Sequence, residues 1–213
     1  MGGELRDLRV VEFEAERTGA IEKVGHRRRI PRLPTGTFEL TMDAYLRTER
    51  PDDADGIHAV TTAAFLDAPH TSHTEQFIVR ELRRSRALTL SLVADFEGHV
   101  IGHVALSPVA ISCGTAGWFG LGPLSVLPRY QGRGLGSRLV QEALKRLQAL
   151  GAKGCVLVGE PAYYGRFGFR AEPGLVLPNV PPQYFQAVCL DGELPAGTVT
   201  FHPAFAANEL ETS

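Results

Sequence analysis

A glycine-rich stretch in the middle of the chain carries the residues best suited to hold a ligand. It reads Gln131-Gly-Arg-Gly-Leu-Gly136 and lies between an apolar segment ending at Leu127 and an amphipathic segment beginning at Leu135. In a strand–turn–helix unit, the first backbone N–H groups of the helix lack partners within it, and the helix dipole favours anions. Glycines also let a ligand approach the backbone closely. The stretch therefore predicts a phosphate-binding turn.

The spacing argues against two common phosphate sites. A P-loop needs Lys followed by Ser or Thr after its last glycine, whereas Gly136 is followed by Ser137 and Arg138. A dinucleotide-binding turn needs G-x-G-x-x-G and an acidic residue on the next strand, whereas these glycines alternate and the predicted strand 154–158 has no acidic residue. From the hexapeptide alone, a structural turn without a ligand stays open.

A second stretch offers groups for acid–base chemistry. The predicted buried strand 154–158 is followed by Glu160-Pro-Ala-Tyr-Tyr-Gly-Arg-Phe-Gly-Phe169. Tyr164 stands four residues before Gly168, and Glu160 directly precedes the proline that opens the segment. A tyrosine hydroxyl and a carboxylate are both able to exchange a proton with a reacting group.

The two stretches together resemble the GNAT N-acetyltransferase superfamily. In that family a Gln-x-x-Gly-x-Gly loop wraps the pyrophosphate of acetyl-CoA, and a later helix ends in Tyr-x-x-x-Gly-Phe. The wording of residues 160–169 looks like the YhbS-like branch of predicted acetyltransferases. The resemblance covers roughly residues 44–205 and leaves about the first forty residues outside it.

The resemblance implies an α/β (α+β) fold with a mixed, mostly antiparallel central sheet. Strands four and five of that sheet splay apart, helices cover both faces, and the pantetheine arm of acetyl-CoA enters the gap. Tyr164 matches the position that protonates the CoA thiolate. The implied cofactor-binding residues are Leu124, Ser125 and Val126 on strand four, and Gln131, Gly132, Arg133, Gly134, Leu135, Gly136 and Ser137 on the loop.

The general base has two candidates in the chain. Glu160 comes first, because it ends strand five at the sheet edge where this fold collects its active site. Since Pro161 suits the first position of a helix, a helix N-terminal carboxylate is an equally good interpretation of Glu160. His103, on a predicted strand, is the second candidate, and a water chain is the third possibility. His70 and His73 fall between two predicted helices that border the acceptor site in the resembled fold, which makes them candidates to meet substrate, although loop histidines more often face solvent.

Further side chains near the motifs receive minor assignments. Arg133 and Arg138 are predicted to reach phosphate oxygens, with the 3′-phosphate of CoA as the target. Tyr163 is predicted to serve in packing, because it is adjacent to Tyr164 and points elsewhere on a helix.

The composition of the chain limits the classes of protein to which it can belong. The chain has 213 residues, 44% apolar and 22% charged, which suits one globular core. A net charge of −2 and a pI near 6.4 give no indication of nucleic-acid or anionic-membrane partners. The absence of an 18-residue apolar run or a secretory signal predicts a cytoplasmic protein. Cys113, Cys155 and Cys189 are too few and too widely spaced to predict a disulfide framework or a metal site.

The pattern along the chain predicts a poorly ordered N-terminal extension over residues 1–41. It predicts one domain over residues 42–213, built on a single mixed sheet. Met42 is a hypothetical natural start of the chain. Ser72 and Glu75 have capping-box spacing. Strands are expected near 44–48, 88–96, 100–111, 118–127, 154–158, 175–177 and 186–190, helices after 52, after 72 and over 135–150, and an irregular tail with an edge strand over 194–205.

The sequence thus predicts an acetyl-CoA-dependent N-acetyltransferase that passes the acetyl group directly to a primary amine in a ternary complex. An acyl-enzyme is not expected, because no cysteine lies in either motif. The alternatives are a catalytically weak GNAT-like module that senses acyl-CoA, and an O-acyl or longer-acyl transferase. The acceptor, whether a small amine, a peptide N-terminus, a lysine or an antibiotic amine, and the assembly, including a homodimer, stay open.

Overall fold

The computed structural model describes residues 44–68 and 73–207. The expectations for residues 1–41, for Met42 and for His70 lie outside the described residues, as does Ser72 itself. No helix of the described part is long and apolar enough to cross a membrane.

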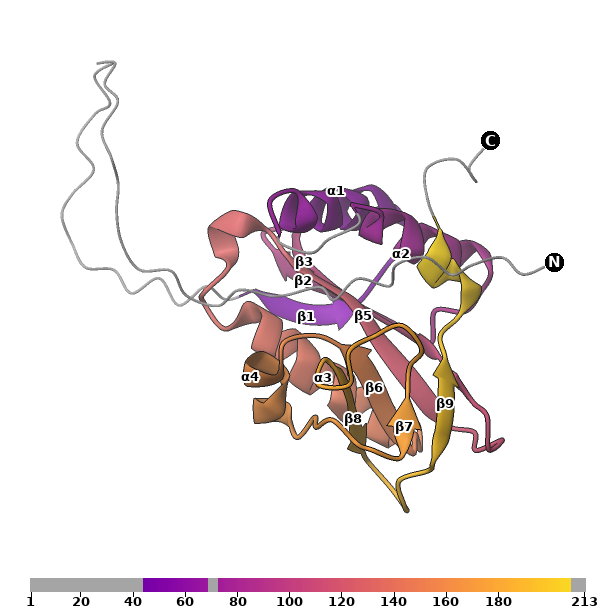
Figure 1. Cartoon of the computed structure of the whole chain (residues 1–213). Coiled ribbons are helices and arrows are strands. Elements are labelled where there is room, and N and C mark those ends of the chain that lie inside the picture. The colour runs from indigo at the N-terminus through magenta and orange to yellow at the C-terminus, as the bar shows by residue number, and fades with distance from the viewer. Residues whose placement is uncertain (1–43, 69–72, 208–213) are drawn as a thin grey trace, which may run out of the picture.

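A six-stranded sheet forms the centre of the domain, in the order β1-β2-β3-β5-β6-β8 (Figure 1). All neighbours are antiparallel except β5 and β6, which are parallel. This arrangement confirms the predicted mixed, mostly antiparallel sheet. The strands are β1 Tyr45–Thr48, β2 Leu90–Phe96, β3 His99–Pro108, β5 Trp118–Val126, β6 Gly154–Val158 and β8 Phe185–Cys189.

A tight turn joins β2 to β3 at the two residues predicted for it. Glu97 and Gly98 have φ values of 52° and 80°, so both adopt the left-handed conformation that two-residue hairpins require. The Asp95 carboxylate accepts a hydrogen bond from the Gly98 amide at 2.9 Å. The turn sets the register of the strand pair that supports β5.

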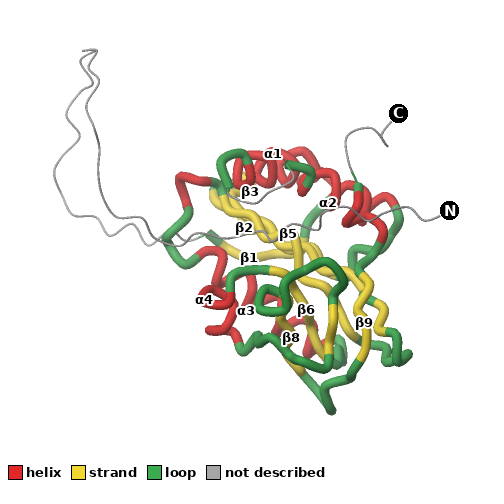
Figure 2. Tube along the Cα trace, viewed as in Figure 1, coloured by secondary structure: helices red, strands yellow, loops and turns green. Residues whose placement is uncertain are grey.

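Helices cover both faces of the sheet, as predicted (Figures 1 and 2). α1 (Ala54–Phe65) and α2 (Glu75–Arg84) lie on one face, and α3 (Leu135–Ala149) and α4 (Pro161–Tyr164) lie on the other. The apolar side of α3 packs on the sheet and is fully buried at Leu135, Leu139, Val140, Ala143 and Leu147. The helix ends before Gly151, whose φ is 75°.

The start of α2 corrects one expectation. Thr74 is the N-cap and Glu75 is the first helical residue, so Glu75 is not at the third position that a capping box with Ser72 would need. His73 has a φ of 58°, which no helical residue adopts, so the helix cannot extend back through it. The predicted capping box is therefore wrong.

A second, three-stranded sheet corrects the expectation of a single one. It has the order β4-β9-β7, with β4 Ala110–Ile111, β9 Gly197–Thr200 and β7 Leu175–Val176. The predicted edge strand of the tail is thus the middle strand of this sheet. β7 lies within the predicted strand 175–177. The pairing of β4, β9 and β7 joins distant segments and leaves no alternating pattern in the sequence, so the sequence could not indicate a second sheet. The small sheet packs on Trp118, Val156 and Phe185.

Candidate active site

The pairing between β5 and β6 stops after three residues. Trp118, Phe119 and Gly120 pair with Gly154, Cys155 and Val156, and no further pairs follow between these strands. β6 continues along β8 instead, whereas β5 continues along β3 only. The predicted splay between the fourth and fifth main strands is therefore present.

An irregularity in β5 lies where the strands part. The register with β3 shifts between Val104 and Leu106, opposite the Gly122-Pro123 step, whose peptide bond is cis. This shift confirms the predicted bulge in the strand. A bulge can accommodate Pro123, because proline has no N–H to donate to the neighbouring strand. The edge of Leu124–Val126 that faces away from β3 is not paired with β6.

The glycine-rich loop follows the parted end of β5. Gly132 and Gly134 have φ values of 70° and 76°, and Gly134 is the N-cap of α3. A β-carbon on either glycine would meet no atom within 4 Å, so what demands glycine there is the backbone conformation. The loop thus presents the N-terminus of α3 with open space around it.

Gln131 ties this loop to the strand. Its Nε2 donates to the backbone oxygen of Val126 at 3.0 Å. The side chain therefore fixes the distance between the parted strand and the start of α3. The predicted strand and loop residues, from Leu124 to Ser137, lie together at one end of the domain.

Ser125 differs from its neighbours because its side chain faces the α1 layer. Its Oγ lies 3.1 Å from Oγ1 of Thr61 on α1, and both side chains are buried. The predicted contribution of Ser125 to cofactor binding is then restricted to its backbone.

Arg138 does not fit its predicted role as a phosphate ligand. Its Nη2 donates to the backbone oxygen of Ala44 at 2.6 Å and so links α3 to the beginning of β1. Arg133 instead lies near Tyr130, with its Cζ 6.0 Å from the ring centroid. The sequence could not separate the two because the partner of Arg138 is a backbone atom 94 positions away.

Tyr164 lies in the apolar core on the α3–α4 face. It is 6% exposed, and its ring is 4.9 Å from that of Tyr163 and 6.1 Å from that of Phe169, between centroids. A β-carbon built on Gly159 would overlap the Tyr164 ring, so Gly159 provides the space that the ring occupies. Burial raises the pKa of Tyr164 above its ordinary value, and the neighbouring Tyr163 adds to the shift.

Tyr163 does more than the packing predicted for it. Burial raises the pKa of Tyr163, and the nearby Ser137 side chain opposes the shift. Ser137 belongs to the first turn of α3, so the two sequence motifs meet at this pair. Arg166 stacks on the Tyr163 ring, with its Cζ 4.3 Å from the ring centroid, and donates from Nε to the backbone oxygen of Tyr163 at 2.8 Å.

Glu160 is the N-cap of α4. Its Oε1 accepts a hydrogen bond from the Ala162 amide at 3.3 Å, and Pro161 holds the first helical position. Glu160 is a half-buried residue just after the end of β6. The capping role considered from the sequence is therefore present, and it leaves the carboxylate beside the parted strands.

His103 lies at the buried end of a polar chain that the sequence did not predict. The side chain is 0% exposed, and its Nε2 lies 2.8 Å from Ser91 Oγ. Ser91 donates to a carboxylate oxygen of Glu49, which Arg83 pairs with at 2.9 Å. Burial lowers the pKa of His103 to about 4, an effect that Glu49 opposes and Arg83 supports. His103 is thus neutral at pH 7.

The chain fixes the tautomer of His103. A carboxylate only accepts, so the single Ser91 hydroxyl proton goes to Glu49. Ser91 Oγ must then accept from Nε2–H, which leaves Nδ1 of His103 without a proton. Nδ1 is buried and has no hydrogen-bond partner among the described residues. No sequence signal joins these residues, because they come from the end of β1, from β2, from β3 and from α2.

Of the two predicted loop histidines, His73 is in the described part of the chain. Its side chain is exposed just before α2. Its backbone oxygen accepts from Nε2 of Gln76 at 2.9 Å. The described residues contain no cluster of three or more His, Cys, Asp or Glu side chains that could hold a metal.

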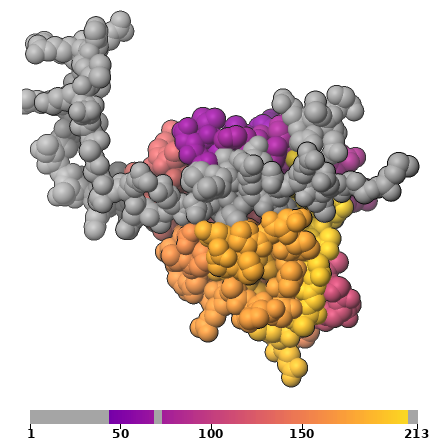
Figure 3. All heavy atoms as spheres, in the orientation of Figure 1, coloured from indigo at the N-terminus to yellow at the C-terminus, as the bar shows by residue number. Residues whose placement is uncertain are grey.

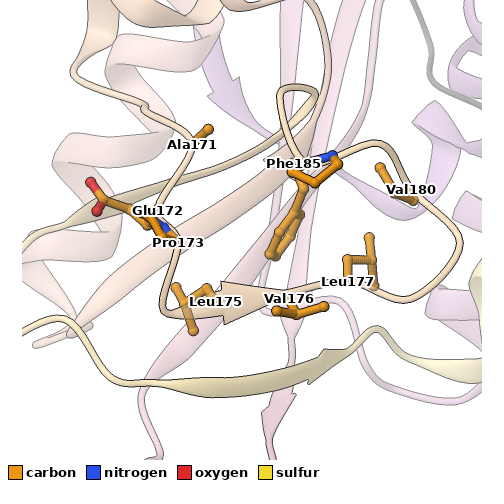
Figure 4. Close-up of a pocket in the computed structure, with 9 residues that line it drawn as sticks. Ala171, Glu172, Pro173, Leu175, Val176, Leu177, Val180 and Phe185 are labelled. Carbon is orange, nitrogen blue, oxygen red and sulfur yellow. The ribbon is translucent and has the colours of Figure 1, made fainter.

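A pocket of about 350 Å³ lies between β8 and the segment that contains β7 (Figure 4). Phe185 extends into the space above β7, and Leu175, Leu177 and Val180 form apolar walls. Phe185 is paired with Val158, the last residue of β6, but its side chain belongs to the core on the face opposite Tyr164. None of the predicted site residues lines this pocket.

In the space-filling view, the α1 region and the orange segment that follows β6 are both visible on one face (Figure 3). The parted strands lie between the two layers to which these segments belong.

A parallel strand pair that opens after three residues, with a glycine turn leading into a helix at its open end, defines an N-acyltransferase type of fold. Residues 55–169, more than half of the chain, match the Acetyltransferase (GNAT) family. The chain therefore belongs to the GNAT acetyltransferase family, and the recognition made from the sequence is confirmed.

Two Escherichia coli proteins are similar in sequence to this chain. The chain is 44% identical over 126 residues to the "Uncharacterized N-acetyltransferase YhbS" of Escherichia coli K12, covering 59% of this chain and 72% of the relative. It is 29% identical over 153 residues to the "Uncharacterized N-acetyltransferase YjhQ" of the same organism, covering 70% and 83% of the two chains.

Solved structures with related sequences share the fold. A GNAT family acetyltransferase from Brucella melitensis, solved in complex with acetyl-CoA, is 46% identical with a TM-score of 0.69, covering 77% of this chain and 99% of that chain. Escherichia coli YhbS, solved in complex with CoA, is 37% identical with a TM-score of 0.71, covering 77% and 92%.

Proposed function

We propose that this protein is an acetyl-CoA-dependent N-acetyltransferase that passes the acetyl group directly to a primary amine. The amine nitrogen attacks the thioester carbonyl carbon, the carbon–sulfur bond breaks, and sulfur leaves as the CoA thiolate. One proton must leave the amine and one must reach the thiolate. Both substrates are held in one ternary complex, which places the reacting atoms in line.

Acetyl-CoA is proposed to bind across the parted strands. The pyrophosphate takes the N–H groups at the loop Gln131–Ser137, and the pantetheine arm takes the unpaired edge of Leu124–Val126. In support, the glycine turn and the parted end of β5 are tied together by Gln131, and the related structures were solved with acetyl-CoA or CoA. Backbone N–H groups on the same edge can stabilise the charge that develops on the carbonyl oxygen.

Tyr164 is proposed as the general acid that gives its proton to the thiolate sulfur. Its raised pKa keeps the hydroxyl protonated at neutral pH, which the role requires. A thiolate is basic enough to take a proton from a nearby hydroxyl during the departure of CoA. Gly159 and the rings of Tyr163 and Phe169 hold the Tyr164 ring in one position.

Glu160 is proposed as the general base that takes the amine proton. Glu160 is a half-buried residue just after the end of β6, and the capping bond of 3.3 Å uses only one of its carboxylate oxygens. His103 is the less suitable candidate, because it is fully buried and its Nε2 is already bonded to Ser91.

A covalent acetyl-enzyme is not part of the proposal. Burial raises the pKa of the Cys155 thiol and keeps it a poor nucleophile. Cys113 is exposed in a turn between β4 and β5, and Cys189 ends β8, so both are on segments other than the loop and α4.

The single observation that carries the proposal is the parting of β5 and β6 with the glycine turn at the same end. Isothermal titration with acetyl-CoA, and then with CoA, tests it. Binding of both at micromolar concentration, followed by amine-dependent release of CoA, is the expected result. A protein that binds neither ligand at millimolar concentration would overturn the proposal. One that binds acetyl-CoA without turnover on any amine would instead be an acyl-CoA sensor.

A further inference from the structure

The apolar pocket in Figure 4 lies beside the end of β6. One of its walls is Phe185, which is paired with Val158, the last residue of β6. Hydrogen bonds hold this part of β8 against the chain that follows β6. The Gly159 amide donates to the Tyr184 oxygen at 2.9 Å, and Nε2 of Gln186 donates to the Gly159 oxygen at 2.9 Å. The pocket is therefore fixed to the strand end that precedes the proposed general base.

The two faces of β6 belong to different cores, because successive side chains of a strand point to opposite faces. Leu157 packs in the core that contains Tyr164. Val156 and Val158, its neighbours along the strand, pack in the core that contains the pocket. Val156 is also the residue paired with Gly120 where β5 and β6 part, so the pocket core reaches the gap. Since the proposed acid protonates sulfur from the first face, an amine can reach the thioester carbon from the second face.

The walls of the pocket suit an apolar group. Leu175, Leu177, Val180 and Phe185 are all buried. Of the described residues that line the pocket, only Glu172 is charged, and its carboxylate points away from Phe185 (Figure 4). The volume of about 350 Å³ is near the lower end of the roughly 300–1,000 Å³ of small-molecule sites. An apolar cavity of about 150 Å³ already holds a benzene ring, so a ring or a short alkyl chain fits here.

We propose that the acceptor is a primary amine carried on an apolar chain or ring, and that this pocket binds the apolar part. The inference rests on the proposed function, since it takes the gap between β5 and β6 as the place of transfer. The apolar part fills the space beside Phe185, and the amine nitrogen is directed towards the end of β6. Glu160 follows Val158 by two residues and takes the amine proton in the proposed transfer. Binding is strengthened by the apolar area that the pocket removes from water.

Initial rates of CoA release over the n-alkylamines from ethylamine to octylamine test this selection, because the ammonium groups of the series have nearly equal pKa values. Each methylene group that enters the pocket is expected to raise kcat/KM about fourfold, until the pocket is filled. 1,6-Diaminohexane has the chain of hexylamine and a second charge. It is expected to react at least about tenfold more slowly than hexylamine, because its second ammonium group would lose its hydration in the pocket.

Two variants change the size of the pocket in opposite directions. Leu177→Phe is expected to move the preferred amine to a shorter chain, with kcat/KM falling about fourfold for each methylene group that no longer fits. Phe185→Leu is expected to move the preference to a longer chain. Leu150→Phe is the matched control, because it makes the same change as Leu177→Phe at an exposed position after the end of α3. Its chain-length profile is expected to match that of the wild type.

Equal kcat/KM values for ethylamine and hexylamine in the wild type would overturn the inference. A Leu177→Phe profile identical to that of Leu150→Phe would overturn it too. In either case transfer to an amine, and with it the proposed function, would still stand. A wild type that acetylates no amine would overturn both. Because the wild-type series needs no substitution, it decides the inference even where a pocket variant does not fold.

Discussion

The ring of Tyr164 lies directly on the backbone of Gly159, the residue that follows β6. A β-carbon built at position 159 would stand 2.7 Å from Cδ2 of that ring and would overlap its Cε2 atom. The space for the proposed acid is therefore created by a missing side chain on the strand that parts from β5. This relationship connects the end of β6, the short helix α4 and the proposed chemistry.

Gly159→Ala is expected to displace the Tyr164 ring. Overpacking a buried position destabilises a protein by about 1–3 kcal/mol, and a misplaced acid slows the departure of the thiolate. We expect a lower melting temperature and a kcat reduced by about tenfold or more, measured by CoA release. Gly165→Ala is the matched control, because a β-carbon at Gly165 meets nothing within 4 Å. A Gly159→Ala variant as active as Gly165→Ala would contradict the placement.

Gln131→Leu removes the bond between the loop and β5. A neutral hydrogen bond contributes about 1 kcal/mol, so the dissociation constant of acetyl-CoA is expected to rise about fivefold. Calorimetric titration measures the change. Gln76→Leu serves as the control, because Gln76 also donates to a backbone oxygen, that of His73, on the α2 side. Equal affinities for the two variants would show that the Gln131 bond has no part in forming the loop.

Glu160→Gln separates the proposed general-base role of this side chain from its helix-capping role. The glutamine oxygen can still accept from the Ala162 amide, but the amide cannot take a proton at neutral pH. We expect kcat/KM to fall about a hundredfold with an unchanged melting temperature. Glu160→Ala is expected to lose activity and also about 1 kcal/mol of stability, because the cap is gone. If Glu160→Gln were as active as the wild type, Glu160 would serve only as the helix cap. The general base would then be His103 or a water molecule.

The buried His103 gives a pH dependence of stability. In the unfolded chain its ordinary pKa is 6.5, whereas in the folded chain burial lowers it to about 4. The unfolded state therefore takes up a proton first as pH falls, so stability is full above pH 6.5 and is lost towards pH 4. The loss reaches about 3 kcal/mol.

The charged groups that act on His103 are Glu49 at the end of β1, Arg83 on α2 and Asp53 before α1. The pKa of Glu49 is lowered in the folded chain, so the stability that Glu49 contributes to the fold is also lost in acid. The wild type must therefore be compared with a variant that lacks only His103. We expect the free energy of unfolding of His103→Gln, measured in urea at several pH values, to fall less than that of the wild type between pH 6.5 and pH 4. Parallel curves for the two proteins would contradict the neutral, buried histidine.

Local patterns in the sequence predicted much of the site. The Gln131–Gly136 turn, the apolar face of α3 and the stop at Gly151 follow from neighbouring residues, and the structure has all three. The bulge in β5 could be predicted because proline removes a donor from a strand, whatever its surroundings. The family resemblance supplied the gap between β5 and β6, which no local pattern contains.

Long-range partners could not be predicted. Arg138 has the same residue type as Arg133 and lies on the same helix–loop unit, but a backbone oxygen of Ala44 determines its position. The chain from Glu49 through Ser91 to His103 joins three strands, and only the register of the sheet brings its members together. The second sheet depends on pairs between Ala110 and Thr200, a contact that leaves no periodic signal.

The most direct test of the account is CoA release from acetyl-CoA by the wild type and by Tyr164→Phe over a panel of primary amines. Calorimetry would give the affinity of each protein for acetyl-CoA in parallel. Tyr163→Phe is the control, since it removes the neighbouring hydroxyl. Tyr164→Phe is expected to bind acetyl-CoA within about twofold of the wild type and to turn over at least about a hundredfold more slowly. Full turnover by Tyr164→Phe would contradict the proposed acid, and a wild type without amine-dependent release would contradict the proposed transfer.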